Sequence, residues 1–453
     1  MNATLTPHIQ PECGVQADDR AAQSRWSQTP IRERLRVVRA LRHLIAENAD
    51  KLASLAASVN DRPIAEKLVS EVLPLADACR WLEKSAGRVL SPRRCGRRGR
   101  PFWMQGVTFE VQRQPFGLVF VIGPANYPLF LPAVHALHAL VAGNAVLLKP
   151  APGTRHVALA FAQLAREAGL DPALLTILPE SVTAARNAIA AGVDKVIFTG
   201  SSENGRDVLA TLAETNTPSV MELSGQDAVL VFADADLDLV VRALRFGTTL
   251  NDGETCIAPR RLIAVSAVAD ELSQRLRHAP EHRLPDCAAD GHLACRTGQA
   301  GSPPSAQAGS LCSVADADSA IALVNSADFA LGCSIFSRDI ARARTLAVRI
   351  KTGFVLINDL IAPTADPRMP FGGVKASGFG STRGDEGLLE MTFPHVVAVR
   401  HGRSRPHFDE PAAGDAQLFS AYIRAAHGSR RFAAFRDLFR ALITKLKTRK
   451  TRP

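Results

Sequence analysis

One cysteine, Cys256, lies in the polar loop Asn-Asp-Gly-Glu-Thr-Cys-Ile-Ala-Pro, residues 251–259, rather than in an apolar run. A thiolate is a strong nucleophile, and a thiol in a polar loop is accessible to a substrate. Many thiols are buried simply as small apolar groups, so the loop alone leaves both interpretations open. The role of Cys256 therefore depends on the other reactive side chains that the fold brings to it.

Two further candidates follow short apolar runs. Glu222 lies at the end of SVMEL, residues 219–223, where we expect its carboxylate either to be solvated or to have a raised pKa, which would suit a general base. Asn126 follows GLVFVIG, residues 117–123, in a turn bounded by prolines, where its amide could donate to a developing oxyanion. Taken alone, Asn126 is more simply explained as a turn residue.

A lysine and a glycine-rich segment follow two other runs. Lys149 ends AVLLK, and Pro150 stops the strand there, which leaves an ammonium group at the edge of the sheet. Gly200-Ser-Ser-Glu-Asn-Gly205 follows KVIFTG, and the helix expected after it would present free N–H groups to an anion such as a pyrophosphate. Such a loop is more often a turn with a helix cap, so it is a weak signal by itself.

The runs that carry these residues alternate with helix-like segments, which predicts a parallel sheet covered by helices on both faces. Ligands in such sheets bind beyond the carboxyl ends of the strands, where all these candidates lie. A helix is predicted over Ile31–Asn60, and a second helical stretch follows Arg62-Pro63 and is interrupted near Pro74. A second α/β block is expected over the runs 227–232, 260–265 and 354–358.

The composition indicates a folded protein of more than one domain, with 453 residues of which 46% are apolar. The N-terminus has no secretory signal and the eight cysteines show no dense spacing, so we expect reduced thiols in the cytoplasm. Prolines, histidines and Gly143 interrupt the apolar run from Pro128 to Leu148, which favours a buried helix and strand over a membrane span.

Several motifs, in a fixed order over about residues 25 to 400, resemble those of the aldehyde dehydrogenase superfamily. The resemblance implies an α/β fold with a parallel-sheet, Rossmann-like cofactor domain and a second α/β catalytic domain. The motifs are Gln114-Pro-Phe-Gly117, Gly123-Pro-Ala-Asn-Tyr-Pro128, Leu148-Lys-Pro150, Phe198-Thr-Gly-Ser201, Glu222-Leu-Ser-Gly225, Phe232-Ala-Asp-Ala-Asp-Leu-Asp238, Gly253-Glu-Thr-Cys256 and Pro370-Phe-Gly-Gly-Val-Lys375.

The resemblance also implies roles. Cys256 would be the nucleophile, Glu222 the general base and Asn126 an oxyanion-hole donor, and the substrate would be a small-molecule aldehyde. The cofactor, NAD or NADP, would be bound by Lys149 at its adenine ribose and by Gly200, Ser201 and Gly205 near its pyrophosphate. Thiolate attack, hydride transfer to nicotinamide and hydrolysis of the resulting thioester would convert the aldehyde to an acid, with no metal.

Three departures from the family pattern bear on the cofactor and the substrate. The family's Glu-x-Phe-Gly-Pro segment, which contacts the nicotinamide ribose, has its nearest counterpart at residues 302–310, which hold no carboxylate, and the chain after Cys256 is shorter than usual. Pro152 replaces a glutamate that would bind the 2′-hydroxyl of NAD, with Arg155 close by, so NADP is as plausible as NAD. Ala125 replaces a tryptophan, which favours a hydrophobic aldehyde.

We expect N-terminal helices and an NAD(P)-binding domain at 25–225, a catalytic domain at 226–390, an oligomerisation strand at 391–402 with another strand region near 103–116, and a basic amphipathic tail at 403–453. The family's strand-mediated assembly implies a homodimer or larger. His282, Cys287, His292 and Cys295 could ligate a metal, but their spacing fits no zinc motif, which favours a variable loop.

The tail carries nearly all of the net charge of +10, since nine lysines and arginines and one acid lie between Arg430 and Pro453. Its apolar residues are expected on one helical face, which suits peripheral contact with an anionic membrane surface and equally a helix docked on the protein itself or on a second subunit. Nucleic acid is not an expected partner, because the aromatic residues lie on the apolar face. That face comprises Phe432, Phe435, Leu438, Phe439, Leu442, Ile443 and Leu446.

Two other functions stay open. An acyl-thioester reductase would run the half-reaction backwards and form an aldehyde, but it has less use for a hydrolytic base such as Glu222. A catalytically weakened scaffold or membrane-associated protein would explain the missing ribose-binding glutamate and the shortened chain after Cys256.

Overall fold

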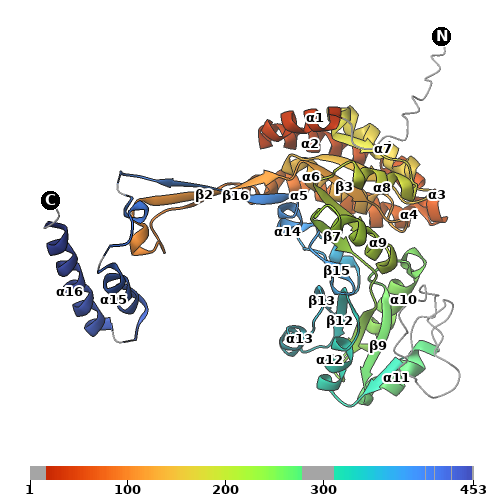
Figure 1. The fold of residues 1–453 in the computed structure, drawn as a ribbon. Helices are drawn as coiled ribbons and strands as arrows, with labels where there is room; N and C mark the ends of the chain where they lie inside the picture. Colours follow the sequence, from red (N-terminus) through yellow and green to blue (C-terminus); the bar gives the residue numbers. More distant parts are fainter. Residues whose placement is uncertain (1–16, 278–310, 404, 413, 430, 451–453) are drawn as a thin grey trace, which may run out of the picture. The chain divides into compact units, whose positions relative to one another are not determined.

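The computed structural model describes residues 17–277, 311–403, 405–412, 414–429 and 431–450 (Figure 1). The chain forms two compact units. The larger contains residues up to 94 together with 110–397, and the smaller contains 95–109 together with 398–453. The residues with predicted catalytic or cofactor-binding roles all belong to the larger unit.

The larger unit begins with helices that share one hydrophobic core with the first sheet. They are α1 (Ala17–Gln28), α2 (Ile31–Glu47), α3 (Ala49–Asn60), α4 (Ile64–Lys67), the π-helical turn η1 (Leu68–Val72) and α5 (Leu73–Val89). The single helix expected over Ile31–Asn60 is wrong, because the chain breaks at Asn48, whose side chain and backbone N–H both donate to the carbonyl of Leu44. The interruption expected near Pro74 is confirmed as the π turn directly before α5, whose first turn tolerates a proline.

The first sheet has six strands in the order β15-β7-β6-β3-β4-β5. All except β15 are parallel, which confirms the predicted parallel sheet, and the connections between them contain helices α6 (Phe130–Ala142), α7 (Arg155–Glu167), α8 (Val182–Ala190) and α9 (Ser202–Ala213). The strands are β3 (Leu118–Ile122), β4 (Ala145–Lys149), β5 (Leu175–Ile177), β6 (Lys195–Thr199), β7 (Ser219–Glu222) and β15 (Gly378–Phe379).

The second sheet has five parallel strands in the order β10-β9-β8-β12-β13, with α10 (Leu237–Thr249), α11 (Ser266–Arg277), α12 (Ala317–Asn325) and α13 (Ile340–Ala347) around it (Figure 1, green to teal). Three strands match the predicted runs, and two more, β10 and β12, were not predicted. The strands are β8 (Asp227–Val231), β9 (Pro259–Val265), β10 (Leu311–Val314), β12 (Gly332–Phe336) and β13 (Phe354–Ile357).

Each large sheet has its own hydrophobic core. The first core draws on buried residues between Ala22 and Leu223, joined by Leu388 and Met391 from the end of the unit. The second draws on buried residues between Ala228 and Phe371. The chain therefore passes from one core to the other directly after the Glu222-Leu-Ser-Gly225 turn, and the domain limits given above stay a prediction.

A three-stranded sheet has the order β1-β2-β16, formed by β1 (Arg93–Cys95), β2 (Val107–Pro115) and β16 (Thr392–Arg400). Strand β16 is an edge strand, and most of its residues are exposed, including Val396, Val397 and Val399. An exposed apolar edge strand is a template for pairing with another chain.

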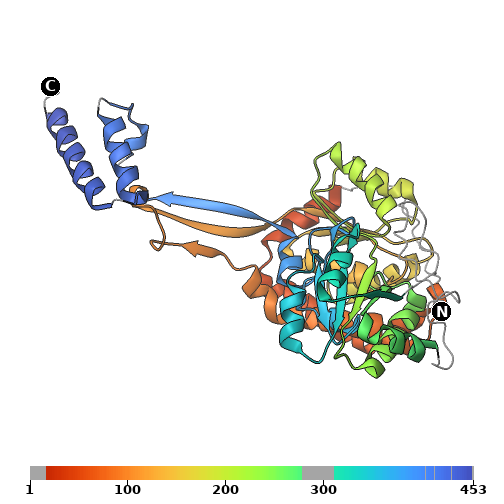
Figure 2. The ribbon, with the colours of Figure 1, turned by 90° about the horizontal axis from the view of Figure 1, so that it is seen from below.

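Helices α15 (Asp415–His427) and α16 (Arg431–Lys450) lie side by side in the smaller unit (Figures 1 and 2). Lys445 of α16 forms an ion pair with Asp415 of α15, so the α16 face that contains Lys445 and Leu438 is turned toward α15. Leu438, which was predicted on the apolar face, therefore lies on the side of α16 that is turned toward α15. No helix among the described residues combines the length and hydropathy needed to cross a membrane.

Candidate active site

Cys256 lies between the short helical turn η4 (Leu250–Gly253) and strand β9. The loop before it is in the left-handed region at three successive residues, with φ of 51° at Asn251, 52° at Asp252 and 72° at Gly253. Asn, Asp and Gly are the residues that adopt this conformation most readily. The segment Asn-Asp-Gly that marked this loop in the sequence thus provides the turn that presents Cys256.

The turn after Glu222 lies directly against the loop of Cys256. A Cβ atom at Gly225 would be 2.4 Å from the carbonyl oxygen of Cys256, far inside van der Waals contact. Only glycine allows this approach, which brings together two segments from the two hydrophobic cores. Glu222 and Cys256, predicted to work together, therefore belong to segments that are in contact.

The surroundings of the Cys256 thiol disfavour its ionised form. Burial, then the negative charges of Glu222 and Asp227, raise the pKa of Cys256 to about 12, while the Arg383 guanidinium acts in the opposite direction. The residue as a whole remains partly exposed. The thiol in this state is predominantly protonated at neutral pH, so a base is needed to form the nucleophile.

Glu222 is held inside the protein, with 4% of its surface exposed. Its carboxylate accepts hydrogen bonds from Thr382 and, at 2.9 Å, from Thr199, and lies 3.4 Å from His135 Nε2. Burial favours the neutral acid, but His135, Thr382 and the Arg383 charge outweigh it and lower the pKa of Glu222. The expectation of a solvated group or a raised pKa is wrong on both counts, because these partners stabilise a buried carboxylate.

Asn126 lies in the loop between β3 and α6 and contacts the loop of Cys256. Its Nδ2 donates to the carbonyl oxygen of Glu254 at 2.8 Å, and the next residue, Tyr127, shares a 2.6 Å hydrogen bond with Thr255. An amide nitrogen carries two hydrogens, so one is left after the bond to Glu254. Asn126 therefore lies against the loop of Cys256 and keeps one donor hydrogen.

The predicted cofactor residues gather at the carboxyl edge of the first sheet. Strand register sets Lys149 opposite Ile122, Phe198 opposite Ile122 and Glu222 opposite Thr199, so these strand ends are neighbours. Lys149 is mostly buried and donates to the carbonyl of Pro150, and burial lowers its pKa against the opposing charge of Glu180. The ammonium thus lies at the edge that binds ligands in parallel sheets.

The glycine-rich segment begins helix α9, as predicted. Ser201 is the N-cap, and its hydroxyl accepts a hydrogen bond from the Asn204 N–H at 3.2 Å. A Cβ atom at Gly205 would lie 2.5 Å from Leu223, and one at Gly200 would lie 2.7 Å from the Phe198 ring. The glycines allow the helix start to pack closely on the sheet, and a lysine with such a helix start fits the phosphates and ribose of a dinucleotide.

Glu180 is a candidate that the sequence reasoning missed. It follows strand β5 and accepts hydrogen bonds from the backbone N–H groups of Gly153 at 3.0 Å and Arg155 at 2.6 Å, at the start of helix α7. These bonds lower its pKa despite partial desolvation. The Glu180 carboxylate therefore occupies the N-terminal end of α7, close to Lys149. It comes from another part of the chain than the family's glutamate, whose position is taken by Pro152.

Arg383 also escaped the sequence reasoning. Its φ is 63°, it is 4% exposed, and its guanidinium lies 4.4 Å from the Phe371 ring centroid and donates to the carbonyl of Thr364. His135, Thr199 and Thr382 were missed as well, since no sequence pattern links them to Glu222. Their common feature is spatial, because β7, β6, α6 and the segment before α14 (Gly384–Leu389) converge at the carboxylate.

Two predicted features lie outside the described residues. They are the metal-ligand candidates His282, Cys287, His292 and Cys295, and the segment 302–310 in place of the ribose-binding glutamate. Across the ranges the structure does describe, there is no cluster of three histidine, cysteine or acidic side chains that could hold a metal ion.

The sequence model of the aldehyde dehydrogenase family matches residues 15–283 and 309–397. The chain is 30% identical over 459 residues to a 4,4'-diapolycopene aldehyde oxidase of Methylomonas sp, which covers 90% of this chain and 86% of the relative. It is also 30% identical over 436 residues to a succinate-semialdehyde dehydrogenase (NADP(+)) of Deinococcus radiodurans, covering 85% of this chain and 89% of the relative.

Solved structures are similar as well. An NAD-dependent aldehyde dehydrogenase from Sinorhizobium meliloti matches with a TM-score of 0.75 and 25% identity over 86% of this chain and 88% of that one. A succinate-semialdehyde dehydrogenase from Burkholderia pseudomallei matches with a TM-score of 0.74 and 25% identity over 84% of this chain and 88% of that one. The similarity therefore extends over both sheets.

Proposed function

The chain belongs to the aldehyde dehydrogenase family, and on that premise we propose that it oxidises an aldehyde to a carboxylic acid through a thioester on Cys256. It is an oxidoreductase that acts on the aldehyde group, with NAD or NADP as its cofactor. The observation that carries the catalytic assignment is the contact of the Glu222-Leu-Ser-Gly225 turn with the carbonyl oxygen of Cys256.

Attack begins when Cys256 releases its proton to water and its sulfur bonds to the aldehyde carbon, while the π electrons of the carbonyl group move to its oxygen. The carbonyl oxygen becomes an alkoxide, which the free hydrogen of the Asn126 amide and the backbone N–H of Cys256 would stabilise. Because Asn126 already donates to Glu254, its amide is fixed before substrate binds. Preorganised donors of this kind lower the barrier without reorganising during the reaction.

NAD or NADP supplies the hydride acceptor when it is bound. Lys149 would hold its adenine ribose, and the segment with Gly200, Ser201 and Gly205 would lie against its pyrophosphate. Hydrolysis of the thioester would then release the acid from Cys256, with Glu222 taking a proton from the attacking water. Thr199, Thr382 and His135 stabilise the negative charge of the Glu222 carboxylate. A lowered pKa keeps Glu222 ready as a base at neutral pH.

The experiment that tests this function is a panel of aldehydes with each cofactor, in which reduced nicotinamide is followed by absorbance and Cys256→Ala is the control. Activity that needs Cys256 supports the proposal. An acyl-thioester reductase would reduce acyl thioesters faster than it oxidises any aldehyde, and a scaffold protein would do neither. The presence of Glu222 disfavours the reductase, because a reductase has less use for a base that promotes hydrolysis of the thioester.

The substrate we favour is an apolar aldehyde. Ala125, next to Asn126, has a smaller side chain than the tryptophan usual in the family, and one relative is named a 4,4'-diapolycopene aldehyde oxidase. The succinate-semialdehyde relatives have a short, charged substrate by name, so the panel should contain both kinds. We also propose the cytoplasm, because the eight cysteines are scattered along the chain without a dense spacing, as is typical of proteins whose thiols stay reduced.

We propose that the protein is a homodimer or larger assembly formed through β16. This edge strand exposes Phe393, Val396, Val397 and Val399, and an apolar edge of this length is rarely left unpaired in water. Size measurement in solution, with Val397→Lys as the variant that introduces a charge at the edge, tests the assembly.

We further propose that α16 makes the peripheral membrane contact. Phe432, Phe435 and Phe439 are 95%, 57% and 66% exposed, and Leu442 and Ile443 continue the same stripe. Arg436 and Arg440 lie along one side of the stripe by helical spacing, whereas Asp437 lies apart from it. The exposed aromatic side chains could insert into the apolar part of a membrane surface, and the arginines beside them could bind its anionic headgroups.

A further inference from the structure

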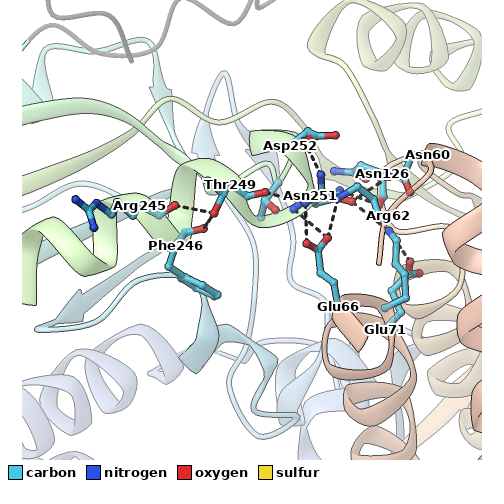
Figure 3. A network of polar contacts seen from close by, with 12 residues as sticks. Asn60, Arg62, Glu66, Glu71, Asn126, Arg245, Phe246, Thr249, Asn251 and Asp252 are labelled. Atoms are coloured by element: carbon cyan, nitrogen blue, oxygen red, sulfur yellow. Dashed lines mark hydrogen bonds and ion pairs between the residues drawn. The ribbon is translucent and has the colours of Figure 1, made fainter. Parts of the chain in front are cut away.

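A buried network joins the loop of Asn126 to the loop of Cys256 through the side chain of Asn251 (Figure 3). Asn251 is 1% exposed, and its Nδ2 donates to the carbonyl oxygen of Asn126 at 3.0 Å. Its Oδ1 accepts hydrogen bonds from Lys67 Nζ at 3.1 Å and from Asn60 Nδ2 at 3.0 Å. One amide group therefore connects both loops to the N-terminal helices.

Lys67 continues the network to the other end of the Asn126 loop. It forms a 3.2 Å ion pair with Glu71, and both side chains are completely buried. Glu71 Oε2 accepts hydrogen bonds from the N–H groups of Leu129 at 2.7 Å and Phe130 at 3.2 Å, where helix α6 begins. Glu71 lies in the π turn η1, a type of turn that is frequent at functional sites.

A second set of contacts fixes the backbone of the Cys256 loop from outside (Figure 3). Arg62 donates to Asp252 at 2.5 Å and to the carbonyl of Thr249 at 3.0 Å, and it pairs with Glu66 at 2.7 Å. Glu66 in turn accepts the Asn251 N–H at 3.2 Å. These bonds hold Asn251 and Asp252 in left-handed conformations that persist only when the surroundings determine them.

We propose that Lys67, Glu71 and Asn251 are positioning residues that keep the Asn126 amide and the Cys256 thiol in register for attack on the substrate. The proposal rests on the catalytic roles proposed above for those two residues. A buried ion pair costs desolvation energy that its attraction often only offsets, so stability alone does not account for the pair of Lys67 and Glu71. Misplacement of reacting groups by a fraction of an ångström, in contrast, slows catalysis strongly.

The test uses Asn251→Gly, which removes the bridging amide, while glycine accepts the φ of 51° without strain. We expect kcat to fall about tenfold or more while KM for the cofactor stays within about twofold, because the cofactor residues are untouched. We also expect backbone amides at 124–130 and at 250–256 both to exchange faster with deuterium. The matched control is Asn216→Gly, an exposed residue with a φ of 53° in the turn after α9.

A folded Asn251→Gly protein whose kcat equals that of Asn216→Gly would overturn the proposal, as would faster exchange confined to 250–256. If Asn251→Gly does not fold, the double variant Lys67→Met/Glu71→Gln tests the proposal. It removes both charges, and the glutamine side-chain oxygen can still accept hydrogen bonds from the N–H groups of Leu129 and Phe130. Full kcat in that variant overturns the proposal. A wild-type protein without aldehyde oxidation would refute the catalytic roles instead, and the exchange measurement would still report whether the two loops are coupled.

Discussion

Gly225 lies so close to the loop of Cys256 that a Cβ atom on it would be 2.4 Å from the Cys256 carbonyl oxygen. Gly225 follows Leu223 of the first hydrophobic core, whereas Cys256 packs against the second, and their contact joins the segment of Glu222 to that of Cys256. The relative position of Glu222 and Cys256 therefore depends on the absence of a side chain at residue 225.

Gly225→Ala should displace the loop of Cys256 and lower kcat/KM for aldehyde about 100-fold, since a shift near 1 Å can have that effect. Steady-state kinetics checks this, with Gly87→Ala as the control, because a Cβ atom at Gly87 meets nothing within 4 Å. Equal activity of the two variants would contradict the contact.

The thiol of Cys256 should react slowly with iodoacetamide at neutral pH. Because burial and the charges of Glu222 and Asp227 raise its pKa to about 12, the thiolate fraction grows about tenfold per pH unit from pH 7 to 10 without a plateau. Glu222→Gln removes a negative charge, which lowers the pKa and should speed alkylation at pH 8. A plateau below pH 9 in the wild-type protein, with Cys256→Ala identifying the labelled site, would show that the thiolate is already stabilised.

Glu180 should make the enzyme prefer NAD. Its carboxylate accepts hydrogen bonds from N–H groups at the start of α7, so these groups cannot donate to a 2′-phosphate. The negative charge of Glu180 also repels that phosphate. Glu180→Gln should therefore raise the ratio of kcat/KM for NADP to that for NAD about tenfold, which corresponds to about 1.4 kcal/mol. Glu214→Gln, at the end of α9, is the control, and an unchanged ratio in Glu180→Gln would place the selection elsewhere.

The exposed stripe of α16 should bind vesicles that contain phosphatidylserine and release them at high salt. Phe435→Ser/Phe439→Ser should weaken binding at least tenfold, since each buried phenylalanine side chain contributes about 1.5–3 kcal/mol. Val348→Ser, at an 88% exposed apolar residue of the larger unit, controls for lost surface hydrophobicity. If the double variant instead lowers the size of the assembly and the wild type ignores vesicles, α16 is a subunit contact.

The sequence made the first sheet and the catalytic candidates predictable for a physical reason. Short apolar runs bounded by Gly, Pro and charged residues mark buried parallel strands, so Lys149, Glu222 and the Gly200 segment could be assigned to strand ends before any contact was known. The break at Asn48 was missed because the apolar spacing predicts helix without indicating where a side chain caps it.

Long-range partners could not be predicted. Lys67 and Glu71 look like ordinary surface residues one turn apart, and only tertiary packing makes them a completely buried pair. The predicted direction of the pKa shift of Glu222 was wrong. Its burial could be inferred from its position in a strand, but the partners that lower its pKa, His135, Thr382 and Arg383, are distant in the chain. Glu180 was overlooked since the pairing of β4 with β5, and not sequence spacing, brings it beside Lys149.

The most direct test of the central claim is intact mass spectrometry of Glu222→Gln after incubation with an oxidisable aldehyde and cofactor. Attack and hydride transfer can proceed without the base of hydrolysis, so the thioester should accumulate. We predict one equivalent of reduced nicotinamide per active site and a mass increase of the acyl group minus one hydrogen on Cys256, absent in Glu222→Gln/Cys256→Ala. Continued turnover with no adduct, or reduced nicotinamide formed equally without Cys256, would contradict the account.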